Sequence, residues 1–131
     1  MPESVGFSTW NDVPSYEFVD GVNIHAIGGD QVLLCKVTYD AGKQVPLHRH
    51  DACEQVMVIT AGSVEMTIEG ETRTLTAGDV VVVNRGLDHE LYSPDGVTFF
   101  EALGPVPLDH VPDRGRDLVL GPDGGAGHVE R

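Results

Sequence analysis

Residues 42–62 read GKQVPLHRHDACEQVMVITAG, and this stretch decides the fold. His48 and His50 stand two residues apart within a predicted β-strand. Because side chains alternate between the two faces of a strand, both imidazoles should point to the same side. Gln55 follows at the start of a second run of strand-forming residues, and His89 lies far downstream beside a glycine-bounded turn. These four side chains can supply most of the first coordination shell of a metal ion, with positions left for water or substrate.

The middle of the chain consists of short runs of strand-forming residues separated by turn residues. Regular spacing with glycine-rich turns is typical of antiparallel sheets, and we find no amphipathic helix between residues 20 and 103. So many strands in one small chain predict an all-β, double-sheet jelly roll, which limits exposed edges. The predicted strands are 22–27, 32–39, 44–50, 55–60, 63–68, 72–75, 80–83, 90–92 and 97–103, with a turn at 61–62.

A chain of 131 residues has room for one domain. We expect residues 1–120 to form it, with 1–20 as an N-terminal arm or edge strand. Residues 104–120 should wrap around the barrel in an ordered way. The glycine-rich residues 121–131 should form a flexible tail.

The formal net charge of −13 restricts the partners of this chain. It repels phosphate backbones and anionic membranes, so we expect no nucleic-acid and no membrane binding. No apolar run is long enough to span a bilayer, and no secretory signal is evident. Cys35 and Cys53 form no CxxC pattern, which favours a cytoplasmic location with reduced thiols. An anionic substrate would need a locally positive site, and a divalent metal would supply one.

The spacing around the first two histidines resembles the first motif of the cupin superfamily. That motif has Gly, five residues, His-x-His, three or four residues, Glu, six residues and Gly. The matching positions here are Gly42, His48, His50, Gln55 and Gly62. The resemblance implies a double-stranded β-helix barrel with a metal in its interior.

The second cupin motif is also present. Its pattern is Gly, five residues, Pro-x-Gly, two residues, His, three residues and Asn. Gly78, Asn84, Gly86, His89 and Ser93 occupy these positions. Asn and Ser replace the usual Pro and Asn at a turn and a strand end, where we expect the changes to be harmless.

A third departure alters the chemistry, because Gln55 stands where the family usually has Glu. Glu54 is the alternative ligand, but strand alternation would aim it at the opposite face. Three histidines and a Glu leave net charge +1 around a divalent ion, whereas a Gln leaves +2. The cation should then bind less tightly and be a stronger Lewis acid. Gln55→Glu should therefore tighten metal binding. These ligands suit one divalent transition metal, Zn, Fe, Ni, Mn or Cu, without selecting among them.

Neighbouring residues are candidates for a substrate pocket. Met57 and Ile59 share the strand parity of Gln55, and Phe99 shares a face with Glu101. Glu101 is the candidate acid/base if that face is inward, and an ordinary solvent-exposed glutamate otherwise.

Other residues have competing interpretations. Arg85 could meet a substrate carboxylate, or it could be a solvated turn arginine. Arg49 should face away from the metal, and Cys53 should be a buried small thiol. We expect His25, His110 and His128 to be structural or surface residues.

Residues 10–120 look like the small single-domain cupins of pectin and uronate degradation. The features that carry this resemblance are Trp10, the turn 20–22 and Glu54-Gln55 after the paired histidines. In that family the Gln is a metal ligand. The resemblance implies metal-assisted conversion of a 4,5-unsaturated monouronate toward its linear keto form. Leu103 replaces a family aromatic, however, and Pro107 stands where the family has an Arg. Arg114 and Arg116 are the candidates to substitute for that Arg.

We expect a metal-dependent enzyme of the lyase or isomerase type. It would act on a small polar carbonyl or carboxylate substrate by Lewis-acid assisted proton transfer. The alternatives are a cupin dioxygenase, a polyketide cyclase, and a non-catalytic module that binds a small ligand or a metal. We also expect a homodimer in which the N-terminal arm protects a sheet edge of the neighbouring copy.

Overall fold

The computed structural model describes residues 6–29 and 31–106. Within these ranges the chain forms strands and one short 3-10 turn, and it has no α-helix. None of these elements is a helix that could cross a membrane. The predicted all-β jelly roll is confirmed. In chain order the elements are η1 (Trp10–Asp12), β1 (Ser15–Val19), β2 (Val22–Gly28), β3 (Leu33–Tyr39), β4 (Lys43–His48), β5 (Glu54–Ile68), β6 (Glu71–Thr76), β7 (Val80–Val83), β8 (His89–Ser93) and β9 (Val97–Gly104).

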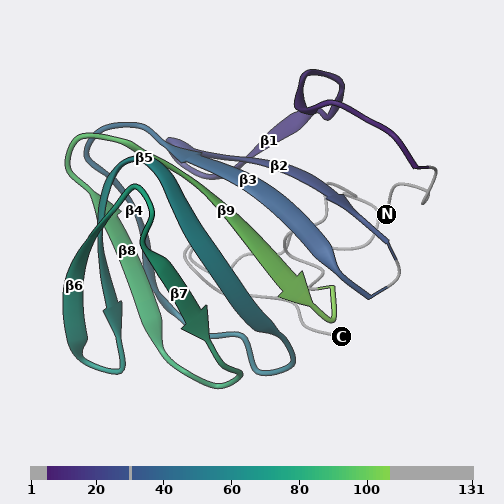
Figure 1. The fold of residues 1–131 in the computed structure, drawn as a ribbon. Helices are drawn as coiled ribbons and strands as arrows, with labels where there is room; N and C mark the ends of the chain where they lie inside the picture. Colours follow the sequence, from purple (N-terminus) through teal and green to yellow (C-terminus); the bar gives the residue numbers. More distant parts are fainter. Residues whose placement is uncertain (1–5, 30, 107–131) are drawn as a thin grey trace.

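Two antiparallel sheets make up the barrel, and both contain β5 (Figure 1). The first half of β5 lies between β9 and β7 in a sheet of order β1-β2-β3-β9-β5-β7. Its second half lies between β8 and β6 in a sheet of order β4-β8-β5-β6. Because one strand belongs to both sheets, the two sheets curl toward each other and enclose an interior.

The sequence predicted two strands, 55–60 and 63–68, joined by a turn, and this part of the prediction is wrong. Residues 54–68 form the single strand β5. Its register against β9 shifts between Ile59 and Ala61, and Gly62 has a φ of +75°. The glycine signal is real, but it marks an irregularity that bends one strand from the first sheet into the second.

The N-terminal region supplies an edge strand. β1 pairs with β2 of its own chain, and the ring of Trp10 packs 5.7 Å from that of Phe100. This is the edge-strand alternative that the sequence left open for residues 1–20. The predicted wrap 104–120 extends beyond the described residues, and so does the whole predicted tail. Arg114, Arg116, His110 and His128 lie there as well.

The core lies between the two sheets and is almost entirely apolar. Inward side chains alternate with outward ones along the strands, as in β9, where every second residue is buried. Buried polar side chains are uncommon in such a core and require hydrogen bonds or ions. Among the described residues the buried polar or charged ones are His50, Gln55, His89, Ser93 and Glu101. Four of these five, all except Ser93, are residues that the sequence proposed for the functional site.

At Gly62 the neighbouring backbone leaves no room for a side chain. A Cβ there would lie 2.2 Å from the carbonyl oxygen of Gly96, in addition to the cost of the left-handed φ of +75°. We therefore expect Gly62→Ala to lower the free energy of unfolding by about 2–4 kcal/mol, measured by urea denaturation.

Gly70→Ala is the matched control. Gly70 also has a positive φ, +85°, but a Cβ there would meet nothing within 4 Å. It should lose only about 1 kcal/mol, the backbone cost alone. Equal losses in the two variants would mean that the close approach to Gly96 is unimportant.

Candidate metal centre

His48 and His89 face each other across two paired strands. They are register partners in the β4–β8 pair, and their ring centroids are 4.2 Å apart. The register shifts between Val45 and His48, where Pro46 has no N–H to donate to a ladder. Val45 and His48 are three residues apart, so regular alternation would place them on opposite faces. The bulge turns the imidazole of His48 to the inner side instead.

His50 is not in a strand, which corrects the predicted strand 44–50. β4 ends at His48, and the backbone that follows is irregular. The carbonyl oxygen of His50 accepts the N–H of Gly86 at 2.8 Å, which ties the loop after β4 to the turn before β8. The ring of His50 lies 5.4 Å from those of both other histidines. Convergence of the three imidazoles therefore depends on a bulge and a loop contact as well as on strand alternation.

Backbone carbonyls fix the tautomers of two of these imidazoles. The Nδ1–H of His48 donates to the carbonyl oxygen of Pro46 at 2.7 Å, and that of His89 donates to Leu87 at 2.9 Å. A carbonyl oxygen only accepts, so Nδ1 carries the proton in both rings and Nε2 keeps its lone pair. A neutral imidazole oriented in this way is the usual form of a metal-binding histidine.

The three histidines have the geometry of a metal site. One ring nitrogen from each of His48, His50 and His89 lies within 4.8 Å of the other two. His50 and His89 are buried and His48 is half-buried, so a cation held there would be largely shielded from solvent. Bonds from nitrogen to a transition metal are about 2.1 Å long, so small side-chain movements would bring all three nitrogens onto one ion.

Gln55 is the buried member of the Glu54–Gln55 pair, while Glu54 is exposed. Its Nε2–H donates to Oε1 of Glu101 at 2.5 Å. Its Oε1 is buried and has no hydrogen-bond partner among the described residues. A buried amide oxygen without a partner is unfavourable, and a cation beside it would satisfy it. The residues present therefore fit a metal bound by three nitrogens and one amide oxygen.

Glu101 is buried on β9, with 3% of its surface exposed. This is the inward alternative of the two that the sequence left open. Its cross-strand partner on β3 is Cys35. Burial raises the pKa of the Cys35 thiol and of the Tyr39 phenol, and the negative charge of Glu101 raises both pKa values further. Both groups therefore stay neutral at physiological pH.

The remaining predicted site residues lie in different environments. Met57, Ile59 and Phe99 are buried in the core, and Arg85 is exposed in the loop before β8. A substrate-binding role for these four residues stays a prediction.

Three more residues have the surroundings that the sequence led us to expect. Arg49 is exposed and pairs with Asp51 at 3.0 Å. Cys53 is buried. His25 donates its Nδ1–H to the carbonyl oxygen of Val13 at 2.8 Å, a structural contact far along the chain from the other histidines.

A small cavity adjoins Gln55 and Glu101. Its volume of about 20 Å³ gives room for about one water molecule. The ring of Phe99 also lines it. Ligand pockets in proteins are usually about 300–1,000 Å³, so this cavity is not by itself a substrate pocket.

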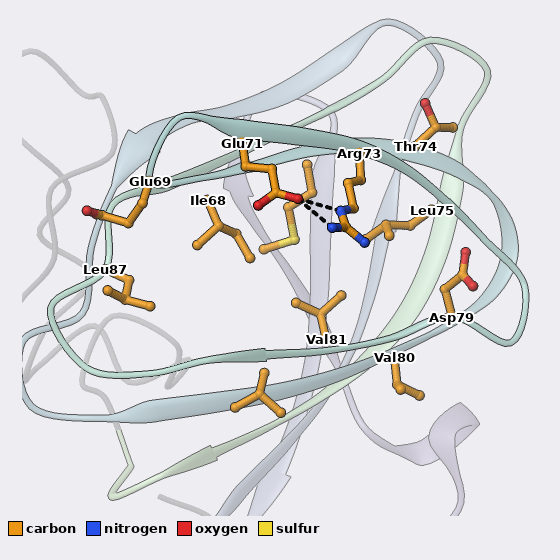
Figure 2. Close-up of a pocket in the computed structure, with 12 residues that line it drawn as sticks. Ile68, Glu69, Glu71, Arg73, Thr74, Leu75, Asp79, Val80, Val81 and Leu87 are labelled. Carbon is orange, nitrogen blue, oxygen red and sulfur yellow. Dashed lines mark hydrogen bonds and ion pairs between the residues drawn. The ribbon is translucent and has the colours of Figure 1, made fainter.

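A larger groove of about 720 Å³ opens between β6 and β7. Figure 2 shows Ile68, Val81 and Leu87 among the apolar side chains that line it, together with the Glu71–Arg73 ion pair. None of the three clustered histidines lines it. Three of its lining residues, Glu69, Glu71 and Asp79, are acidic and would repel an anion. We therefore assign the chemistry to the histidines and not to the groove.

The sequence did not predict one contact of the site, the hydrogen bond from Gln55 to Glu101. Strand parity placed Gln55 on a pocket face and left the face of Glu101 open. What was missing was the register of β5 against β9, in which Met57 lies opposite Glu101. Long-range register of this kind is set by the whole sheet, and no local pattern encodes it.

Comparison with known proteins agrees with this fold. Residues 35–99 match the family model described as "Cupin domain". The pectin degradation protein KdgF of Dickeya dadantii (strain 3937) is 29% identical over 101 residues, which cover 76% of this chain and 92% of that protein.

Two solved structures show the same fold. The RmlC-like cupin from Shewanella frigidimarina NCIMB 400 has a TM-score of 0.77 at 24% identity, covering 82% of this chain and 97% of that chain. KdgF from Halomonas sp. has a TM-score of 0.76 at 19% identity, covering 82% and 100%. With its double-sheet barrel, its histidine cluster and these matches, the chain belongs to the cupin superfamily.

Proposed function

We propose that this cupin binds one divalent transition-metal ion through His48, His50, His89 and the amide oxygen of Gln55. The observation that carries the proposal is the set of three ring nitrogens within 4.8 Å of one another in a buried interior. The buried amide oxygen of Gln55 supports it independently. The donors suit Zn, Fe, Ni, Mn or Cu, and they do not select one of these.

Charge favours a small anionic substrate. All four proposed ligands are neutral, so a divalent cation together with its ligands would have a net charge of +2. The whole chain carries −13 and would otherwise repel an anion. A carboxylate or enolate would therefore be attracted to the site itself.

The proposed reaction is of the lyase or isomerase type, with an unsaturated uronate as the leading substrate. The relative from Dickeya dadantii is named as a pectin degradation protein, which supports this class of substrate. When bound, the metal would polarise a carbonyl or carboxylate oxygen. In this chain Glu101 is the buried carboxylate beside the proposed ligands, so we assign it the transfer of the proton. The barrel wall excludes bulk water from Glu101 and from Gln55, since both side chains are buried.

Metal binding is the first test. We expect His89→Ala and His48→Ala to bind the metal at least about 100-fold more weakly than the unaltered protein, because each removes one ligand nitrogen. Metal content after dialysis and titration calorimetry measure this loss.

His25→Ala is the matched control, since His25 donates to the carbonyl oxygen of Val13. It should bind metal as the unaltered protein does. A full equivalent of tightly held metal in His89→Ala would exclude the proposed ligand set.

Turnover is the second test. The metal-loaded protein should consume a 4,5-unsaturated monouronate. The loss of absorbance of the substrate's conjugated double bond measures this consumption. His48→Ala should lose this activity. Tight uronate binding without turnover would point to the non-catalytic binding module. Oxygen consumption with a redox-active metal would point to the dioxygenase.

We also propose that the protein is a homodimer, formed through the outer face of the first sheet. The N-terminal arm, which the sequence suggested as the dimer contact, instead pairs its strand β1 with β2 of its own chain. The outer face, on β3, β5, β7 and β9, has exposed apolar side chains that extend across neighbouring strands. In the first sheet, the described outward positions of β3, β7, β9 and the first half of β5 carry one cation, Lys36, and one anion, Glu54. This face is therefore nearly neutral on a strongly negative chain. A second copy can approach there without repulsion, as a twofold interface requires. The exposed apolar residues are Leu34, Val56, Val58, Val80 and Val82.

Val82→Glu should break this dimer. A charge at a side chain that is 58% exposed costs the monomer little and costs the interface much. Light scattering should give twice the 14.1 kDa chain mass for the unaltered protein and for Thr74→Glu on β6, and the single chain mass for Val82→Glu. An unaltered protein that stays monomeric at high concentration would contradict the assignment.

The cytoplasmic location stays a prediction from the sequence.

A further inference from the structure

We infer that Glu101 is a positioning residue for Gln55. Its carboxylate holds the amide with the oxygen free to face the histidines. It also supplies, behind that amide, the negative charge that the cupin motif usually places on the ligand itself. The inference rests on the proposed metal site and gives Glu101, which would not touch the metal, a second role besides the proposed proton transfer.

The first step is the chemistry of the amide. The two ends of a glutamine amide have almost the same shape, so packing alone does not decide which end faces which neighbour. A carboxylate accepts hydrogen bonds and does not donate them. Glu101 therefore attracts the Nε2–H of Gln55, and the reversed amide would place oxygen against oxygen. The outcome is visible in the structure, where Oε1 of Gln55 is the end without a hydrogen-bond partner.

The second step is the sheet register that makes this contact possible. In the β5–β9 pair, Met57 lies opposite Glu101 and Gln55 lies opposite Leu103. Gln55 and Glu101 are therefore diagonal neighbours on the inner face of the sheet, a separation that two long side chains can bridge. Both residues are at least 96% buried, so water does not compete for the hydrogen bond.

The third step is the balance of charge. A divalent ion with three neutral imidazoles and one amide has net charge +2, and Glu101 reduces the total to +1. This equals the total that three histidines and a Glu would give. The buried carboxylate in turn gains from the N–H of Gln55 and from the nearby cation, which together offset its loss of hydration.

This arrangement also alters the expectation for Gln55→Glu. From the sequence alone, a carboxylate at position 55 should tighten metal binding. In the structure that carboxylate would lie against Glu101, and two buried carboxylates in contact repel each other. The pair should therefore work with one carboxylate and one amide, in either order.

A swap of the two groups tests the pair, with metal affinity measured by titration calorimetry. We expect Glu101→Gln and Glu101→Asp each to weaken metal binding by about 10-fold or more, as is usual when a group that orients a ligand is changed. The double variant Gln55→Glu/Glu101→Gln should return to within about 10-fold of the unaltered protein, since it restores one carboxylate, one amide and the hydrogen bond between them.

Two outcomes of the affinity measurements would overturn the inference. Glu101→Asp keeps the charge but shortens the reach, so unchanged affinity in this variant would mean that charge alone matters. A double variant that binds no better than Glu101→Gln would mean that the two groups do not act as a pair.

The metal-free protein provides a readout that is independent of the proposed function. Gln55→Glu alone should lower the melting temperature by about 5 °C or more, and adding Glu101→Gln should recover most of the loss. In the unaltered protein, nitrogen-15 spectra should show one Nε2 proton of Gln55 shifted by its hydrogen bond to Glu101, and this shift should disappear in Glu101→Ala.

Failure of the proposed function is thereby distinguishable from failure of the inference. If the unaltered protein binds no metal, the proposed function fails. The melting temperatures and spectra then still decide whether Glu101 orients the amide. Absence of any recovery in the double variant would overturn that orientation.

Discussion

The structure depends on one constraint, that strand β5 is hydrogen-bonded in both sheets. Its first half pairs with β9 and β7, and its second half pairs with β8 and β6. Four of the other strands are therefore placed by a single segment of 15 residues. The bend at Gly62 lets one strand pair in both sheets. The residue at the bend has to be glycine, because the close approach to Gly96 leaves no space for a side chain. Closure of the barrel and the position of its buried polar groups both follow from this strand.

The same strand connects the two parts of the site. Gln55 near its beginning lies beside β9, which carries Glu101. Ile68 at its end is the register partner of His89 on β8, and His89 is in turn the partner of His48 on β4. Residues from four strands are thus positioned by backbone pairing before any metal is present. A site built in this way has its donor atoms arranged by the fold, and the cation does not have to organise them.

Much of this arrangement could be predicted from the sequence, and the remainder has a physical reason for being missed. Periodicity and turn residues predict nearly every strand, because each depends on neighbours along the chain. The burial of Gln55 and the exposure of Glu54 follow from strand parity. The bulge at Pro46 and the bend at Gly62 are local breaks in that alternation, and the single residues that cause them also occur in ordinary turns. The contact between Gln55 and Glu101 spans 46 residues and depends on register.

Moving the carboxylate away from the proposed metal has a chemical consequence. A Glu ligand would donate its charge directly to the cation and reduce the polarisation available to a substrate. An amide oxygen is a weaker donor, so more positive charge remains at the open coordination positions. The carboxylate of Glu101 still keeps the total buried charge at the value that the usual cupin ligands would give. Separating the ligand from the charge in this way favours chemistry on an anionic substrate without the full desolvation cost of a doubly charged site.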